Sequence, residues 1–194
     1  MATATVTPAT VEAEAPHPQP DKLYEILYGR VVEKPMSALA AWIATRLATR
    51  LDRFTQEHQL GNIVSEMLFI LHARRNLRRR PDVAFVSVER WPLNQLLPFD
   101  EDWAVSPSLA IEIVSPSNTF NGLLAKIREY FRHGVLEVWV FSPEERLIYV
   151  YRSPTEVRIL KAGDTISTEL IPGWSAPITE LIPEVPEQLP ALDE

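Results

Sequence analysis

The chain has 194 residues and a formal net charge of −7, a length that suits one domain with a sizeable hydrophobic core. Because it contains no cysteine, a disulfide scaffold, a thiolate zinc site and a cysteine nucleophile are excluded, and any metal ion must be held mainly by oxygen. Its 46% hydrophobic and 23% charged residues are typical of a soluble globular protein, and no apolar run approaches the roughly 20 residues of a membrane span.

The two ends of the chain have the composition of loose segments. Residues 1–20 are rich in Ala, Thr, Pro and Glu, and they lack the basic start and the apolar stretch of a secretory signal. We therefore predict a disordered arm on a cytoplasmic protein. Residues 183–194 form a predicted acidic, proline-rich tail, so the folded domain is expected over residues 21–182.

The charge is distributed unevenly along the chain. Residues 1–36 have a net charge of −2, residues 37–80 of +5 and residues 81–194 of −10. Arginines crowd the end of the middle block, at Arg74, Arg75, Arg78, Arg79 and Arg80. The cluster is compatible with phosphate contacts to a nucleic acid and equally with the solvated end of a hairpin.

The first predicted elements are a hairpin and a helix. Residues 24–28 and 31–34 are β-prone runs on either side of Gly29-Arg30, which predicts the hairpin. Residues 37–58 contain no Gly or Pro, and their apolar side chains recur at spacings of four and three. This pattern predicts a long amphipathic helix that begins at Ser37 as its N-cap.

Two strands and a loop are expected next. Residues 63–72 and 81–87 are rich in Val, Ile and Phe, and we predict that they pair as a hairpin through the arginine-rich turn. Residues 89–107 contain three prolines and the acidic run Asp100-Glu101-Asp102. They are expected to form an irregular loop over the fold, with the acidic run in solvent.

The region after this loop has the pattern of a βαβ unit. Residues 109–115 are a nearly continuous apolar run, residues 119–133 have helical spacing, and residues 136–141 are a second apolar run. Buried parallel strands have such continuous apolar runs. Residues 147–151 and 157–161 are predicted to add antiparallel strands.

Glu112 and Asp82 are the candidate metal ligands. Glu112 interrupts an apolar strand, where a carboxylate needs a partner, a hydrogen-bond network, a raised pKa or a metal ion. A structural ion pair with an arginine is the alternative. If the strand that begins at Asp82 is a neighbour, about 4.8 Å away, the two carboxylates can share one cation. Mg²⁺ or Mn²⁺ would suit such oxygen ligands and could also bind a phosphate.

Lys126 is the candidate cation of the site. On a helical wheel, Lys126 and Tyr130 flank the buried stripe of the predicted helix, whereas Arg128, Glu129 and Arg132 point farther into solvent. Lys126 could therefore reach the carboxylates and stabilise developing negative charge. The angle alone is equally compatible with a surface lysine whose ammonium stays in water.

The polar residues before the predicted helix have two interpretations. Ser115, Ser117, Asn118 and Thr119 are expected to cap the free amides, although a helix N-terminus can also bind a phosphate. The chain has no Gly-x-Ser-x-Gly motif, no phosphate-binding glycine-rich loop and no zinc-protease motif. Hydrolase triads and nucleotide-binding folds are therefore disfavoured.

Three ordered motifs resemble the Uma2 family of putative restriction endonucleases, a bacterial branch of the PD-(D/E)xK nuclease superfamily. They are RPDVAFVS at residues 80–87, IEIVSPSN at residues 111–118, and Lys126 followed by Tyr130 and Gly134-Val135. The resemblance extends over residues 24–181. It implies an α/β (α+β) fold with a restriction-endonuclease-like core, in which helices flank a mixed central sheet, with an N-terminal hairpin and C-terminal antiparallel strands.

By the same resemblance, the activity would be Mg²⁺-dependent cleavage of DNA phosphodiester bonds. Asp82 matches the aspartate of the Pro-Asp motif, Glu112 the motif acid, and Lys126 a lysine displaced onto the helix. Glu66 lies where many relatives also have an acid, which makes it a further metal-ligand candidate. Two positions depart from the pattern: Val114 replaces the lysine of the parent motif, and Asn121-Gly122 replaces acids that relatives often carry.

Three functions are therefore carried forward from the sequence. The first is a metal-dependent endonuclease, for which a homodimer would suit the cutting of two strands. The second is a catalytically degenerate module of the same fold that binds nucleic acid or protein. The third is an unrelated metal-dependent hydrolase of a small phosphate ester. Trp91 and Trp103 could serve a dimer interface, but packing over the core is the preferred interpretation.

Overall fold

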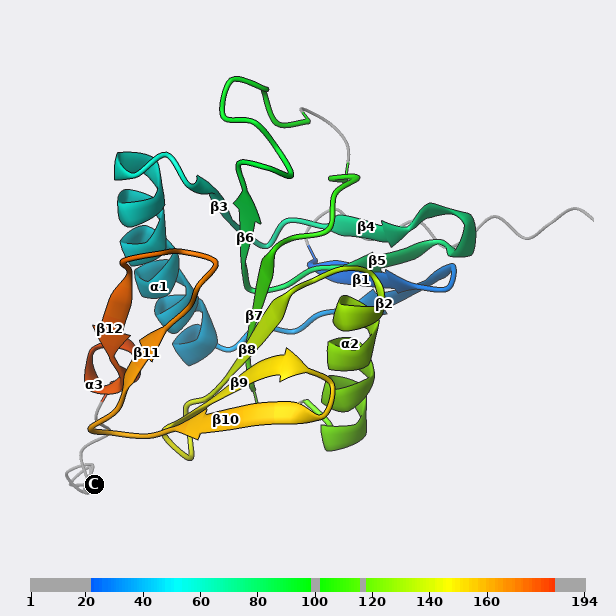
Figure 1. Ribbon diagram of the computed structural model, residues 1–194. Coiled ribbons are helices and arrows are strands. Elements are labelled where there is room, and N and C mark those ends of the chain that lie inside the picture. The colour runs from blue at the N-terminus through cyan, green and yellow to red at the C-terminus, as the bar shows by residue number, and fades with distance from the viewer. Residues whose placement is uncertain (1–21, 99–101, 116–117, 184–194) are drawn as a thin grey trace, which may run out of the picture.

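The computed structural model describes residues 22–98, 102–115 and 118–183 (Figure 1). The predicted arm and all of the predicted tail except Pro183 lie outside these ranges, as do Asp100, Glu101 and Ser117. The centre of the fold is a six-stranded sheet with the order β10-β9-β8-β7-β6-β3. Its strands are β3 (Gly61–Ser65), β6 (Val83–Ser87), β7 (Leu109–Ile113), β8 (Glu137–Ser142), β9 (Leu147–Ser153) and β10 (Glu156–Leu160).

Two smaller sheets and the helices surround the central sheet. A four-stranded sheet has the order β2-β1-β5-β4, and β11 pairs with β12. The strands are β1 (Tyr24–Leu27), β2 (Arg30–Glu33), β4 (Phe69–His72), β5 (Leu77–Arg79), β11 (Thr165–Ser167) and β12 (Ser175–Pro177). The helices are α1 (Ala38–Glu57), α2 (Phe120–Arg132) and α3 (Ile178–Leu181), with a 3₁₀ turn η1 (Ala73–Arg75).

The central sheet is mixed, as predicted. β7 and β8 are parallel and are joined by α2, whereas every other neighbouring pair in this sheet is antiparallel. The βαβ unit, the first hairpin and the β9–β10 hairpin are therefore confirmed. The short elements β11, β12 and α3 carry no repeating apolar pattern long enough to predict them.

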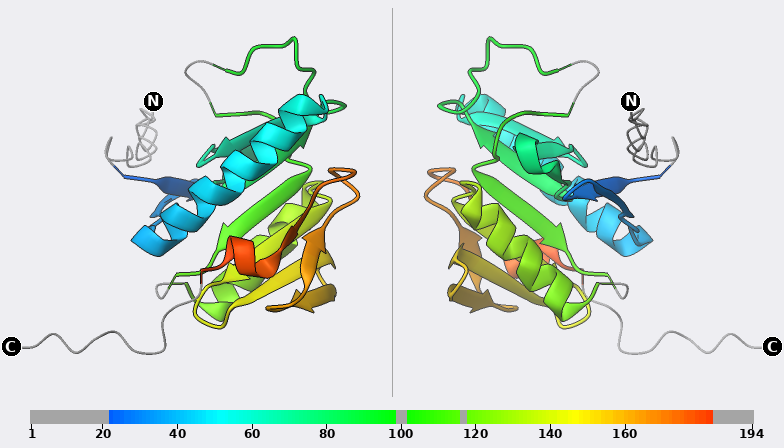
Figure 2. Two further views of the ribbon diagram at one scale, coloured as in Figure 1. Left: turned by 90° about the vertical axis from the view of Figure 1, so that its left-hand side faces the viewer. Right: turned by 90° about the vertical axis from the view of Figure 1, so that its right-hand side faces the viewer.

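Alternate residues of the central strands face opposite sides of the sheet. Phe85 and Ile111 belong to the core beneath α1, whereas Ala84 and Ala110 belong to the core beneath α2. Figure 2 shows these two helices on opposite faces of the sheet. Glu112 has the parity of Ala110, so its side chain projects toward α2.

Side-chain caps start both long helices, as the sequence predicts. Ser37 Oγ accepts a hydrogen bond from the amide of Ala40 at 3.1 Å, and Thr119 Oγ1 accepts one from the amide of Gly122 at 3.2 Å. Each bond satisfies one of the amides that the first helical turn leaves free. The Thr119 cap fixes the start of α2 and thereby the position of Lys126 two turns further along.

The predicted pairing of residues 63–72 with 81–87 is correct for the start of the first segment only, because the rest of that segment belongs to another sheet. β3 pairs with β6 in the central sheet, whereas β4 pairs with β5 in the four-stranded sheet. The chain changes sheet after Ser65, where Glu66 has a φ of 54°. That left-handed conformation is uncommon outside glycine and ends the β3 strand.

In the loop between β6 and β7, Trp91 and Trp103 pack over the core, as expected, whereas residues 92–96 are exposed. Trp103 is fully buried, forms an isolated bridge to Phe69, and meets the ring of Trp91 edge-on at 5.3 Å.

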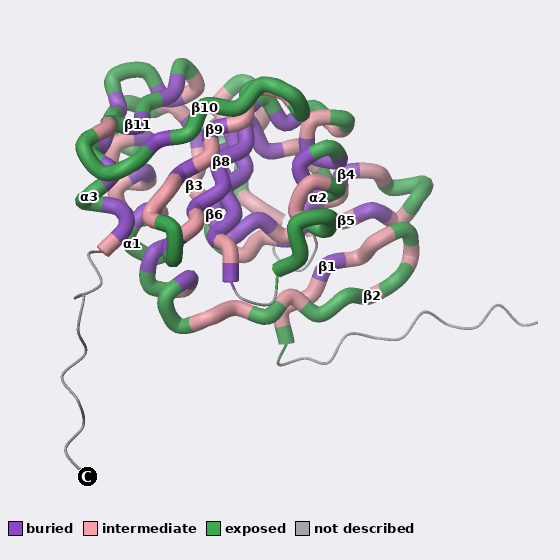
Figure 3. The backbone as a smooth tube through the Cα atoms, turned by 90° about the horizontal axis from the view of Figure 1, so that it is seen from below, coloured by how far each residue is buried: buried purple, intermediate pink, exposed green. Residues whose placement is uncertain are grey.

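Figure 3 shows the buried residues concentrated in the central strands. Within the described residues, no helix combines the length and the hydrophobicity that crossing a bilayer requires.

Candidate active site

Three carboxylates stand in a row across one end of the central sheet. The antiparallel register pairs Val83 with Ile111 and with Ser65. Continued by one residue, the same register sets Asp82 opposite Glu112 on one side and opposite Glu66 on the other. The amide of Glu66 donates to the carbonyl of Asp82 at 3.3 Å, which agrees with this continuation. Side chains directly opposite in such a pair have Cβ atoms about 5 Å apart.

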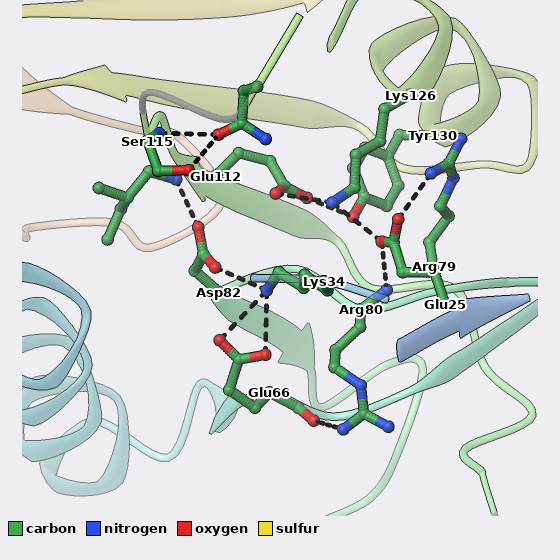
Figure 4. A network of polar contacts seen from close by, with 12 residues as sticks. Glu25, Lys34, Glu66, Arg79, Arg80, Asp82, Glu112, Ser115, Lys126 and Tyr130 are labelled. Carbon is green, nitrogen blue, oxygen red and sulfur yellow. Dashed lines mark hydrogen bonds and ion pairs between the residues drawn. The ribbon is translucent and has the colours of Figure 1, made fainter. Parts of the chain in front are cut away.

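Two of these acids, Asp82 and Glu112, open into a cleft of about 420 Å³ between α2 and the first hairpin. Asp82, Glu112 and Lys126 all line it, so the structure brings the three predicted catalytic residues together. They come from three elements: the residue before β6, the strand β7 and the helix α2 (Figure 4). Glu66 is close by, since it shares a lysine partner with Asp82.

Asp82 is held by one backbone amide and one lysine. Its Oδ2 accepts from the amide of Ile113, and its Oδ1 lies 2.6 Å from the Nζ of Lys34. The same ammonium bonds both carboxylate oxygens of Glu66, at 2.9 and 3.1 Å. Burial raises the pKa of Glu66 to about 7, although the charge of Lys34 opposes the shift.

Glu112 is held by a tyrosine and by the predicted lysine. The hydroxyl of Tyr130 donates to Oε1 at 2.6 Å, and the Nζ of Lys126 donates to Oε2 at 2.8 Å. The Lys126 ammonium also lies 2.9 Å from Oε1 of Glu25. Every oxygen of Asp82 and Glu112 therefore has a donor, and one oxygen of each acid faces an ammonium group.

A buried layer of charges lies behind Lys126. Arg79 binds Glu25 at 2.7 Å and Glu129 at 2.6 Å, and all three side chains are nearly inaccessible to solvent. The amide of Arg80 adds a bond to Glu25 at 2.9 Å, and the hydroxyl of Tyr28 donates to Glu129 at 3.0 Å. Because buried charges are tolerated only in such paired arrangements, this layer fixes the position of Lys126.

Burial and neighbouring charges shift the pKa values of Glu112, Glu25 and Lys126. Burial raises the pKa of Glu112, and the charge of Lys126 offsets part of that effect. Burial disfavours the Lys126 ammonium, but Glu112 and Glu25 outweigh it and move its pKa above the usual range. Burial also acts upward on Glu25, whose pKa nevertheless falls to about 2 because Lys126 and Arg79 stabilise its charge. Lys126 therefore acts at neutral pH as a cation and hydrogen-bond donor.

The donor set fits a hard divalent cation. Asp82 and Glu112 provide carboxylate oxygens beside an open cleft, and Mg²⁺ is commonly held by one or two carboxylates while it keeps several waters. Among the residues that the structure describes, no group of three or more His, Cys, Asp and Glu side chains could hold a metal ion, so the protein would supply at most two such ligands. Remaining coordination positions would therefore belong to water or to a phosphate.

The charge of the network also favours a dication. Five carboxylates bond to three side-chain cations, so the formal excess is two negative charges once Glu66 and Glu112, whose pKa values burial raises, are ionised as well. The carboxylates are those of Glu25, Glu66, Asp82, Glu112 and Glu129, and the cations are those of Lys34, Arg79 and Lys126. One divalent ion would balance this excess.

The predicted arginine cluster divides into internal and exposed members. Arg79 is not available to a phosphate because its guanidinium is buried between two glutamates. Arg78 pairs with Asp102, and the guanidinium of Arg80 donates to backbone carbonyls, one of them at Tyr24. Of the five arginines predicted to contact phosphates, only Arg74 and Arg75 are exposed in the described part of the chain.

Three members of the network escaped sequence reasoning as site residues. Lys34 follows a short strand and has no periodic neighbours that would reveal its role. Glu25 entered only as part of the first hairpin. The expectation that Glu129 points into solvent is wrong, because Arg79 arrives from the four-stranded sheet and binds it. An acid on the polar side of a helical wheel gives no sign of such a distant partner.

The start of α2 explains one departure from the family pattern. Gly122 donates its amide to Thr119, and a Cβ added at this glycine would lie 2.9 Å from Thr119 Oγ1. A bare glycine therefore suits the close cap. The side chain of Asn118 accepts from the amide of Ser115 at 2.7 Å, which closes the turn before the helix.

Comparison with known proteins agrees with this geometry. The family model Uma2, described as "Putative restriction endonuclease", matches residues 12–179. The crystal structure of "a putative nuclease belonging to DUF820" from Anabaena variabilis has a TM-score of 0.72 and 18% identity, over 85% of this chain and 92% of that chain. At that identity the likeness establishes the shared fold. No protein with a curated description matches the chain.

The family match spans the central sheet, α1, α2 and the whole row of acids. The matched range includes Asp82, Glu112 and Lys126, which together line a single cleft. The nuclease-like fold expected from these motifs is the observed one. The chain belongs to the Uma2 family of putative restriction endonucleases.

Proposed function

We propose that this chain is an endonuclease that uses Mg²⁺ or Mn²⁺ to hydrolyse phosphodiester bonds of DNA. The observation that carries the proposal is the contact of Lys126 with Glu112, one strand away from Asp82, in an open cleft. Two acids and a lysine whose pKa is raised, at one edge of a sheet, are suited to phosphoryl chemistry. Membership of a family described as restriction endonucleases supports the same reaction.

The metal ion and the protein side chains would have separate tasks. The chemistry that Mg²⁺ or Mn²⁺ supplies, when held by Asp82 and Glu112, is polarisation of a phosphate oxygen and a lowered pKa of water. The Ile113 amide and the Tyr130 hydroxyl each hold one oxygen of an acid and so orient it. Lys126 keeps its proton and stabilises negative charge that develops on the phosphate.

A second candidate is a catalytically degenerate module that binds nucleic acid or protein. The specific observation in its favour is that every oxygen of Asp82 and Glu112 already has a donor from the protein itself. Such a network could be stable without any metal ion. Asn121 and Gly122, in place of acids, point in the same direction. The two candidates differ in whether a divalent ion binds and DNA is cut.

A cleavage assay separates them. The purified protein is incubated with plasmid and single-stranded DNA in Mg²⁺, Mn²⁺ or EDTA. Cleavage is expected with either metal and not with EDTA. Glu112→Gln and Lys126→Met are each expected to lower the cleavage rate by at least about a hundredfold, because they remove a ligand and a transition-state cation.

Matched controls are available on the surface. Glu144 and Lys161 are exposed and do not line the cleft. Glu144→Gln and Lys161→Met should keep the wild-type rate, and circular dichroism should show that all four variants are folded. Metal-dependent cleavage that persists in both cleft variants would contradict the assignment. A wild-type protein that neither cuts DNA nor binds a divalent ion would favour the binding module.

A further inference from the structure

Lys34 occupies a cation position in the cleft. Its Nζ lies 2.6 Å from Asp82 Oδ1 and 2.9 and 3.1 Å from the two oxygens of Glu66. An ammonium group has three N–H donors, and here three carboxylate oxygens surround it. Only 11% of the Lys34 side chain is exposed, so these contacts are made largely out of water. Figure 4 shows the ammonium between the two acids.

The backbone holds Lys34 at the edge of this site. Its amide donates to the carbonyl of Leu23 at 2.9 Å, which extends the hairpin beyond β2. Pro35 follows immediately and restricts the chain before the cap of α1. The backbone of Lys34 is thus anchored, while its long side chain reaches the acids from outside the central sheet.

The two oxygens of Asp82 are not equivalent. Oδ2 accepts from the backbone amide of Ile113, which cannot leave without disturbing β7. Oδ1 is the oxygen that remains for a metal ion, and this is the oxygen that Lys34 holds. A divalent ion bound there, with an oxygen ligand at about 2.1 Å, would lie close to the ammonium and repel it.

Lys126, the other lysine of the cleft, is held differently. Lys126 is anchored by Glu25 in addition to Glu112, within the buried layer that includes Arg79. Lys34 has its second anchor in Glu66, whose side chain is 21% exposed and offers both oxygens to the ammonium. Each lysine would keep one partner after leaving its acid in the cleft, but the partner of Lys34 is the more exposed, at 21% for Glu66 against 8% for Glu25, so the move costs Lys34 less than it would cost Lys126.

We infer that Lys34 is a tethered counter-cation that competes with the divalent metal ion for Asp82 and remains on Glu66 when the ion binds. This inference rests on the proposed function only in treating Asp82 as a metal ligand. Lys34 would keep Asp82 neutralised before the ion arrives, and it would weaken the affinity of the site for the ion. The affinity of the site for the divalent ion would thus depend on Lys34, which lies outside the three sequence motifs.

Isothermal titration calorimetry with Mn²⁺ alone tests this competition. Lys34→Met is expected to bind Mn²⁺ about tenfold more tightly than the wild type, or better, because the competing charge is gone. Lys22→Met is the matched control. Lys22 is an exposed lysine beside the same hairpin, and it pairs with Glu33. Its affinity should equal that of the wild type.

A double variant shows whether the gain passes through Asp82. Lys34→Met combined with Asp82→Asn should lose the tighter binding. Thermal unfolding with Mn²⁺ and with EDTA gives a second measurement, in which Mn²⁺ should raise the Tm of Lys34→Met more than that of the wild type. Lys34→Gln, whose amide can still donate to a carboxylate, replaces Lys34→Met if that protein does not fold.

The outcomes separate this inference from the proposed function. Unchanged or weaker Mn²⁺ binding by Lys34→Met overturns the inference, even if the wild type cuts DNA. Tighter binding by Lys34→Met supports it, even if the wild type cuts no DNA and the nuclease proposal fails. If none of these proteins binds Mn²⁺, both the inference and the metal-dependent mechanism are wrong.

Discussion

Two buried glutamates of this chain have opposite surroundings. Glu25 is bonded by Lys126 and Arg79, which hold its pKa at about 2 against the effect of burial. Glu137 lies at the start of β8, far from those cations, and burial raises its pKa although Trp139 donates a hydrogen bond to it. In its ionised form Glu25 stabilises the folded protein, whereas ionised Glu137 destabilises it.

The Glu137 pKa predicts a stability that falls as the pH rises. The unfolded chain loses this proton near the ordinary glutamate pKa, while the folded protein keeps it to a higher pH. Between those two values the folded state binds more protons, so the free energy of unfolding decreases with pH. Glu137→Gln removes the cost and keeps an oxygen that can accept from Trp139. The variant should have a higher Tm than the wild type at pH 8 and an equal one near pH 4.

The control for this measurement is Glu169→Gln, because the side chain of Glu169 is 93% exposed. It should leave the Tm unchanged at both pH values. A Glu137→Gln protein that is less stable than the wild type at pH 8 would show that the ionised carboxylate contributes to the fold.

At the scale of residues, Glu112 and Lys34 mark what the sequence could and could not predict. Glu112 was predictable because a carboxylate inside an apolar strand requires a special partner. The partner itself, Lys126, was predicted from its place on the helical wheel together with the family pattern. Lys34 was not predictable, since its role depends on how the first hairpin docks against the end of β3. That contact joins segments with no shared periodicity.

Among the elements, β3 is the one that aligns Glu66 with Asp82. Gly61 begins this strand with a φ of 148°, and a Cβ at this position would lie 2.2 Å from the carbonyl oxygen of Val86. No side chain fits that space, because the obstructing atom belongs to the backbone of β6. The close approach of β3 and β6 therefore depends on glycine.

Gly61→Ala is expected to be strongly destabilising. The added methyl group must push β3 away from β6, and we expect a loss of more than about 2 kcal/mol in the free energy of unfolding. Gly163→Ala is the matched control: its φ of 95° is also positive, but nothing lies within 4 Å of the added Cβ. That change should cost only the backbone strain, about 1 kcal/mol. Equal losses in urea denaturation would contradict the role of the close approach.

The elements also differ in how far the sequence could predict them. The βαβ unit was predictable because β7 and β8 are continuous apolar runs on either side of a helical pattern. The four-stranded sheet was not, because β4 and β5 are short and the pairing of β1 with β5 joins residues about fifty positions apart. Local patterns carry no signal for such a non-local pairing.

For the molecule as a whole, the question is which lysines and arginines are left to bind a polyanion such as DNA. The net charge is −7, and the lysines and arginines nearest the acids are bonded to them or to backbone carbonyls. Arg74 and Arg75 are exposed in the turn η1. This turn meets the tip of the first hairpin, where the amide of Gly29 donates to the carbonyl of Asn76 at 3.1 Å. Tyr28 at the same tip lines the cleft, so the two arginines lie at one end of the candidate DNA path.

This placement predicts the salt dependence of DNA binding. Each phosphate neutralised on duplex DNA contributes about −0.9 to the slope of log K against log salt concentration. Replacing Arg74 and Arg75 together by alanine should therefore make the slope less negative by about 2, and it should weaken binding to duplexes of unrelated sequence equally. The measurement is fluorescence anisotropy in EDTA, which prevents metal-dependent cleavage. Arg152→Ala with Arg158→Ala, on exposed positions of β9 and β10, changes the net charge equally and should leave the slope as it is. An equal change of slope in both double variants would mean that overall charge, and not the η1 turn, attracts the DNA.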